Sequence, residues 1–258
     1  MRAAGEFERI ADDAAMSVAE REEALWTAAE LYQTAGMRTE ERSALERVVE
    51  RYPASFDQTL EARMRLADIA QLDADIGGRM RWLEDIVAVD AAAGAARTDR
   101  SRYLAATATL ELTEPKRLSF VALKLTAPLK ASLERKRELM EQTLTAYGKA
   151  ADYGVAEVTT ASTFRIGQMY QQFSRDLLDS ERPADLDADA LEQYDILLEE
   201  QAFPFEEQAI EVFEANAARA ADGVFDIWVE QSFDALATLM PARYAKSERS
   251  GESLALLN

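Results

Sequence analysis

Apolar side chains recur at three- and four-residue spacing along most of this chain, and this periodicity limits the folds available to it. Residues three or four apart share one face of an α-helix, whereas a strand needs strict alternation, which no long stretch shows. Glycine and proline, at 10 and 6 of 258 residues, are too scarce to interrupt many helices. The clearest shared faces are Leu25, Ala28, Ala29 and Tyr32; Leu45, Val48, Val49 and Tyr52; and Leu125, Leu129, Leu133, Met140, Leu144 and Tyr147. We therefore expect an all-α protein.

Local signals place some of the helix boundaries. Capping-box spacing, which satisfies backbone N–H groups at a helix start, occurs at Ser17 with Glu20, Ser55 with Gln58, and Asp189 with Glu192. Residues 116–152 are predicted to form one unusually long helix. Pro128 lies inside that segment, and we expect it to kink the helix because proline removes a backbone donor.

Short helices joined by short turns raise the possibility of repeated helix pairs. Tyr32 and Pro53 lie 21 residues apart, and Ala220 and Pro241 repeat that interval towards the other end. Residues 57–90 follow a less regular version of the pattern, with no proline to close it. The alternative interpretation is an ordinary set of antiparallel helices without true repeats.

The segment Ile166-Gly167-x-x-Tyr170 carries the best single match to a family pattern. With the two intervals, it resembles the tetratricopeptide repeat (TPR) family, whose 34-residue unit is a helix-turn-helix. The resemblance implies a right-handed α-solenoid of antiparallel helix pairs over residues 1–244, with sub-regions 1–114 and 115–244 and a flexible tail at 245–258. Small residues at Ala29, Gly167 and Ala217 would let the partner helix approach.

Charge is distributed unevenly along the chain. The total of 48 acidic and 29 basic residues leaves a net charge of −19, and residues 151–258 alone hold 22 acidic against 7 basic ones. Residues 116–137 reverse this balance, with seven basic residues and one acidic residue. Net acidity argues against nucleic-acid binding, which depends on Lys and Arg at phosphates, and favours a basic protein partner.

Several kinds of chemistry are excluded by composition. With no Cys and no His, the chain has no thiolate nucleophile, no imidazole base, no Ser-His-Asp triad and no ordinary zinc site. Asp185-x-Asp187-x-Asp189 begins like a calcium loop, but the sixth and twelfth positions hold Ala190 and Ile196 in place of Gly and Glu. Helix capping by Asp189 is the simpler interpretation, and no metal or cofactor is expected.

Three further segments have two interpretations each. The basic stretch 116–137 could lie on an anionic surface or partner, or turn its apolar side to the core and its charges to water. Phe203-Pro204-Phe205, expected between two helices, could be an exposed docking element or fill the seam between helix pairs. Asn216 could bond to a turn backbone or face a bound peptide.

The TPR resemblance also implies a groove, lined by the first helix of each pair. Its family positions correspond here to Glu23, Trp26, Glu30 and Gln33 in the first unit; Phe164, Gln168 and Gln171 in the Gly167 unit; and Glu211 and Glu214 in the last unit. Trp26 and Phe164 are the expected anchors for a bound segment, because buried aromatic rings often dominate binding energy. Packing of both rings between repeats is the alternative.

These features favour a non-catalytic scaffold that holds a protein or peptide segment. Residues 153–161 and 194–207 are also similar to TPR proteins of the Gram-negative cell envelope, which implies a periplasmic role beside Tol-like or gliding-type machinery. The first residues, Met1 to Glu6, lack the apolar core of an export signal, which leaves a cytoplasmic location open, and no transmembrane segment is expected. The alternatives are a metal-dependent carboxylate enzyme or enzyme subunit on a helical solenoid, and a homo-oligomeric scaffold.

Overall fold

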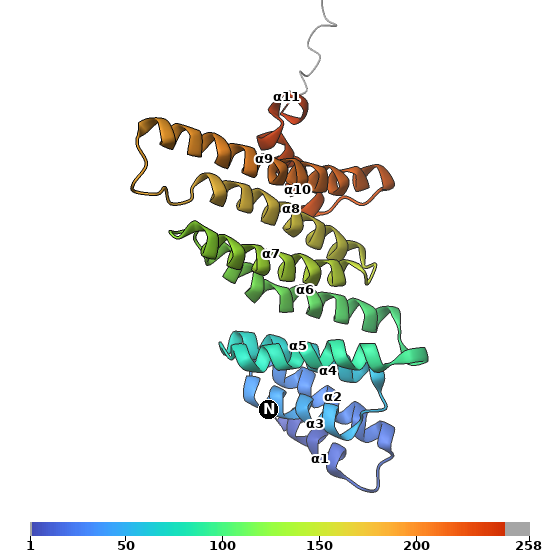
Figure 1. Ribbon diagram of the computed structural model, residues 1–258. Helices are drawn as coiled ribbons and strands as arrows, with labels where there is room; N and C mark the ends of the chain where they lie inside the picture. The colour runs from blue at the N-terminus through green and yellow to red at the C-terminus, as the bar shows by residue number, and fades with distance from the viewer. Residues whose placement is uncertain (1, 246–258) are drawn as a thin grey trace, which may run out of the picture. The chain divides into compact units, whose positions relative to one another are not determined.

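The computed structural model describes residues 2–245 (Figure 1), and every regular element within them is helical, which confirms the all-α prediction. The chain divides between Glu114 and Pro115 into two compact units. The expected tail at 245–258 lies, apart from its first residue, outside the described residues.

The N-terminal unit is built from consecutive antiparallel helices, each packed on the next (Figure 1). These are α1 (Arg2–Asp12), α2 (Val18–Thr34), α3 (Arg38–Arg51), α4 (Phe56–Leu72) and α5 (Ile76–Ala92), followed by a short 3-10 turn, η1 (Gly94–Ala96), and the first part of α6 (Asp99–Ala122). The predicted apolar face of α2 is buried at all four of its positions and forms the core with side chains of α1, α3 and α4. The periodicity of this segment therefore predicted its packing correctly.

The C-terminal unit contains the end of α6 and the longer helices that follow it (Figure 1). These are α7 (Leu129–Ala151), α8 (Ala156–Leu178), α9 (Ala188–Ala217) and α10 (Ile227–Leu239), with the short elements η2 (Ala218–Asp222) and α11 (Pro241–Tyr244). Helix α8 packs against α7, α9 and α10. Gly167 allows α8 to approach α9, because a Cβ atom there would lie 2.6 Å from the Phe213 ring. The predicted role of Gly167 is thus confirmed.

Two prolines, Pro128 and Pro204, act differently from what the sequence suggested. The single long helix predicted at 116–152 is wrong: α6 ends at Ala122, and α7 begins at Leu129 with Pro128 as its N-cap. Proline disfavours helical backbone at the residue before it, so the chain separates into two helices here. Pro204, by contrast, lies inside the continuous helix α9, so Phe203-Pro204-Phe205 is not a linker between helices.

The helix starts were predicted with mixed success. Ser17 and Glu20 form the full capping box at the start of α2, as predicted. Ser55 is the N-cap of α4, but its side chain makes no capping bond. The cap of α9 is Asp187 and not Asp189; its carboxylate accepts the Ala190 N–H at 2.9 Å.

Candidate functional site

The predicted groove residues of α2 lie on a face that contacts α4. Glu23, Glu30 and Gln33 are exposed, whereas Trp26 is partly buried and donates its indole N–H to Glu30 at 2.9 Å. The Arg65 guanidinium of α4 lies over the Trp26 ring, 5.3 Å from its centroid. The place of Arg65 on this face could not be predicted from sequence, because only the folded pair of helices brings it there.

A cleft of about 250 Å³ lies beside this face in the N-terminal unit, and Gln33 is one of its lining residues. Its charges largely neutralise one another, since Arg65 donates to the buried Glu41 carboxylate at 2.6 Å. Desolvation raises the pKa of Asp68 in the same cleft, and Glu111 raises it further, against a lowering by Arg79. The cleft therefore presents no strong preference for either sign of charge.

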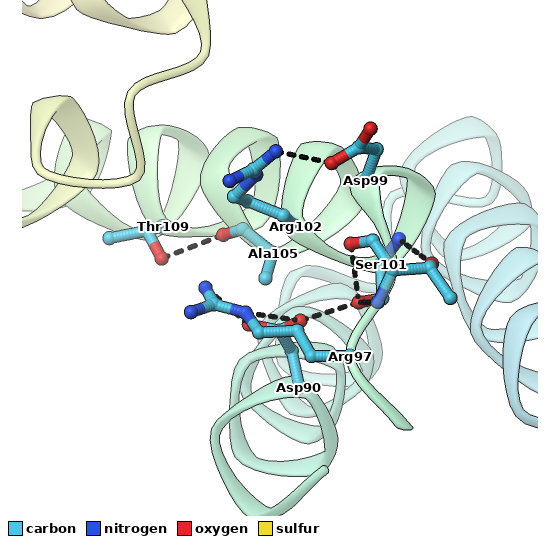
Figure 2. Close-up of polar contacts among 8 residues, drawn as sticks. Asp90, Arg97, Asp99, Ser101, Arg102, Ala105 and Thr109 are labelled. Carbon is cyan, nitrogen blue, oxygen red and sulfur yellow. Dashed lines mark hydrogen bonds and ion pairs between the residues drawn. The ribbon is translucent and has the colours of Figure 1, made fainter. Parts of the chain in front are cut away.

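The buried carboxylate of Asp90 holds the start of α6 in the same unit through hydrogen bonds (Figure 2). Asp90 accepts hydrogen bonds from the Ser101 hydroxyl at 2.7 Å and from Arg97 Nε at 3.1 Å, and Arg97 Nη2 lies 2.8 Å from its other oxygen. Ser101 and Thr98 also exchange side-chain bonds with each other's backbone N–H. Because both Asp90 oxygens have partners, we interpret this cluster as a structural cap and not as a reactive site.

Phe164 is not an exposed anchor in this structure. Its side chain is only 5% exposed and packs between Phe213 and Trp228, with ring centroids 5.7 Å away in each case. The ring lies on the core side of α8, which is the packing alternative noted above for this residue.

The other groove residues expected in the last unit lie in the C-terminal part of a long helix. Glu211 and Glu214 belong to α9, which packs against both α8 and α10. Glu214 accepts hydrogen bonds from Arg243 at 2.6 Å and from the Tyr244 hydroxyl at 2.9 Å. Asn216 is fully buried and donates to the Thr160 carbonyl and the Ser232 hydroxyl, so the peptide-facing interpretation of Asn216 is wrong.

Gln168 and Gln171, the remaining predicted residues, line a cleft of about 210 Å³ between α6 and α8 in the C-terminal unit. Three arginines surround it: Arg117 from α6, and Arg165 and Arg175 from α8. Phe120, Val121 and Met169 provide apolar side chains to the same cleft. We call this the arginine cleft; its three arginines contrast with the net charge of −19 of the whole chain.

The polar side chains of the cleft follow one stripe of α8. Arg165, Gln168, Gln172 and Arg175 are spaced three, four and three residues apart, which places them on one helical face. Arg165 donates to Gln168 at 2.8 Å and lies over the Trp228 ring at 5.1 Å, so its position is fixed. Arg175 is exposed, and its guanidinium has no hydrogen-bonded or ion-paired partner among residues 2–245.

The carboxylate of Asp176, the residue that follows Arg175, already has partners. Asp176 accepts a hydrogen bond from Gln172 at 3.0 Å and forms an ion pair with Lys136 at 2.5 Å. Lys136 is fully buried, donates to the Phe120 carbonyl at 2.9 Å, and lies 4.6 Å from the centroid of the Phe120 ring. This network joins α6, α7 and α8 beneath the cleft, so Asp176 is engaged elsewhere and leaves the Arg175 guanidinium available to an anion.

Metal binding has no support in the described part of the chain. Among residues 2–245, no three acidic side chains come together in a way that could hold a metal ion. In the same residues, no helix combines the length and the apolarity needed to cross a membrane.

Comparison with known proteins gives no relationship: no protein-family model matches the chain, and no curated protein matches its sequence.

Proposed function

We propose that this chain is a non-catalytic scaffold that binds a segment of another protein, with the arginine cleft as its contact site. The observation that carries the proposal is that three arginines from two helices line one small cleft, and that one of them, Arg175, has no partner among residues 2–245. A guanidinium is a planar fork of N–H donors that fits a carboxylate. Two observations support a binding role over a catalytic one. The chain has no His and no Cys, and the carboxylate oxygens of Asp90 already have partners.

The arginine cleft favours a segment that carries Asp or Glu side chains. The net charge of the chain alone suggested a basic partner. Salt screens charges that are more than about 10 Å away, so the charges that line the site govern its attraction for a bound segment. The apolar side chains of Phe120 and Met169 would contact the aliphatic part of the bound segment.

The packing of consecutive helices within each unit, α1 to α5 in one and α7 to α10 in the other, supports a TPR-like architecture, and we propose a right-handed α-solenoid of this type. We also propose a periplasmic location and a role in a cell-envelope assembly, on the resemblance of residues 153–161 and 194–207. Release of the native protein by osmotic shock tests the location. Retention with cytoplasmic markers would contradict it.

Reversal of one cleft charge tests the binding site. Arg175→Glu should weaken binding of a fluorescein-labelled peptide of alternating Glu and Ala by about tenfold or more, since it puts a carboxylate against the ligand. Arg137→Glu is the matched control: it makes the same charge change on the exposed side of α7, outside the cleft, and should change the affinity by about twofold or less. Fluorescence anisotropy at low and moderate salt measures both.

The control also separates the site from general electrostatics. If Arg175→Glu and Arg137→Glu weaken the peptide equally while both variants keep their circular dichroism spectra, the cleft is not the binding site. For the native partner, a photo-crosslinking residue at Gln171 should capture discrete proteins from the source organism. Adding Arg175→Glu should abolish those adducts.

A further inference from the structure

The outer side of α9 exposes large apolar side chains near the middle of the helix. Ile196 is 49%, Leu197 56% and Phe203 59% exposed. Ile196 and Phe203 are seven residues apart, so they lie on one line along the helix, and Leu197 adjoins Ile196. Phe205 points the other way and packs edge-on against Phe173, with ring centroids 4.5 Å apart. In Phe203-Pro204-Phe205, the Phe205 ring therefore packs against the core, and the Phe203 ring is exposed.

Acidic side chains flank this apolar line. Glu192, Glu199 and Glu200 are exposed, and at 100° per residue they fall within the same half of the helix surface as Ile196 and Phe203. None of the three forms an ion pair or a side-chain hydrogen bond with another residue of the described chain. Helix α9 itself contains no Lys or Arg, and Arg182, just before it, is paired with Asp195 at 2.7 Å.

Pro204 adds a backbone acceptor to this side of the helix. Proline has no N–H, so the Glu200 carbonyl lacks the hydrogen bond that residue 204 would normally donate within the helix. Glu200 lies between Ile196 and Phe203 along the helix, so this oxygen is close to the apolar line.

We infer that this surface, which we call the α9 face (Ile196, Leu197 and Phe203 with Glu192, Glu199 and Glu200), docks a cationic amphipathic helix of a partner protein. Ile196 and Phe203, which are two turns apart, match the i and i+7 anchors of such a helix. The unpaired carboxylates match Lys or Arg on its flanks and would repel an anionic membrane or a nucleic acid. The α9 face differs from the arginine cleft in its helix and in the charge it selects, so it stands independently of the proposed function.

A designed probe tests the inference on the full chain. The probe is a fluorescein-labelled peptide of leucine and lysine, with leucines at i, i+3, i+4 and i+7. Ile196→Ser with Phe203→Ser should weaken its binding by about tenfold or more, because the anchors are lost. Leu118→Ser is the matched control: it removes an apolar side chain that is 54% exposed on α6, and it should change the affinity by about twofold or less.

A second variant examines the charges and does not depend on the apolar pair. Glu192→Gln with Glu199→Gln and Glu200→Gln should weaken the probe several-fold and flatten the salt dependence of its affinity. The inference is overturned if the probe does not bind the parent chain. It is also overturned if neither variant weakens probe binding, or if that binding does not depend on salt. A further outcome is that the probe does not bind, that the parent chain self-associates in light scattering, and that Ile196→Ser with Phe203→Ser abolishes this self-association. The occupant of the α9 face would then be a second copy of the chain, and the inference fails.

Discussion

Replacement of Asp176 by alanine is expected to lower the free energy of unfolding by about 3–5 kcal/mol, because it leaves the ammonium of Lys136 buried without its counter-ion. Both side chains are almost completely excluded from water. The remaining carbonyl partners of Lys136 satisfy its hydrogen bonds only in part and carry no full negative charge. Urea unfolding followed by circular dichroism measures the loss.

A surface ion pair in the same unit provides the control for this prediction. Asp195→Ala breaks the pair with Arg182, in which both side chains are substantially exposed, and should cost less than about 1 kcal/mol. A second comparison removes both buried charges: Lys136→Met with Asp176→Leu should recover much of the loss, since neither desolvated charge remains. Equal costs for Asp176→Ala and Asp195→Ala would show that the buried pair is not coupled to folding.

The helices of the N-terminal unit could be predicted because the information for them is local. The face formed by Leu25, Ala28, Ala29 and Tyr32 is defined by spacing alone, and burying it needs only a neighbouring helix with a similar face. The capping box of Ser17 and Glu20 is equally local, since all its atoms lie within four residues.

Helix ends at proline could not be predicted in the same way. Pro115 and Pro204 lie inside α6 and α9, whereas Pro128 stands at the boundary between α6 and α7. A proline inside a helix costs one backbone hydrogen bond and some strain, and packing along a long helix can outweigh that cost. The balance depends on contacts with other helices, which a single segment of sequence does not contain.

The candidate site was predicted only in part. Gln168 and Gln171 were assigned to a groove and do line the arginine cleft, whereas the three arginines were not included. The stripe of Arg165, Gln168, Gln172 and Arg175 was a usable signal, because its spacing is visible in the sequence. The contribution of Arg117 was not visible in this spacing, since Arg117 comes from a different helix. Lys136, counted as part of a basic surface stretch, is buried by its pairing with Asp176.

Substitution of Phe213 by alanine is the other change expected to have a large effect, with a loss of about 3–5 kcal/mol in the free energy of unfolding. Phe213 is fully buried, and its ring fills the space that the missing side chain of Gly167 leaves between α8 and α9. Trp228, whose ring contacts Phe164 in the same cluster, can report the unfolding of this unit by its emission once Trp26 and Trp82 are replaced by Phe.

A double-mutant cycle with Gly167 determines whether this contact is the cause. Gly167→Ala alone should cost about 1–3 kcal/mol, because its Cβ atom would overlap the Phe213 ring, whose nearest carbon lies at 2.6 Å. In the double variant that Cβ atom enters the space vacated by the ring, so the combined loss should be smaller than the sum of the two single losses by about 1 kcal/mol or more. Strictly additive losses would mean that the two helices do not approach each other through Gly167, and the close packing of α8 on α9 would then need another origin.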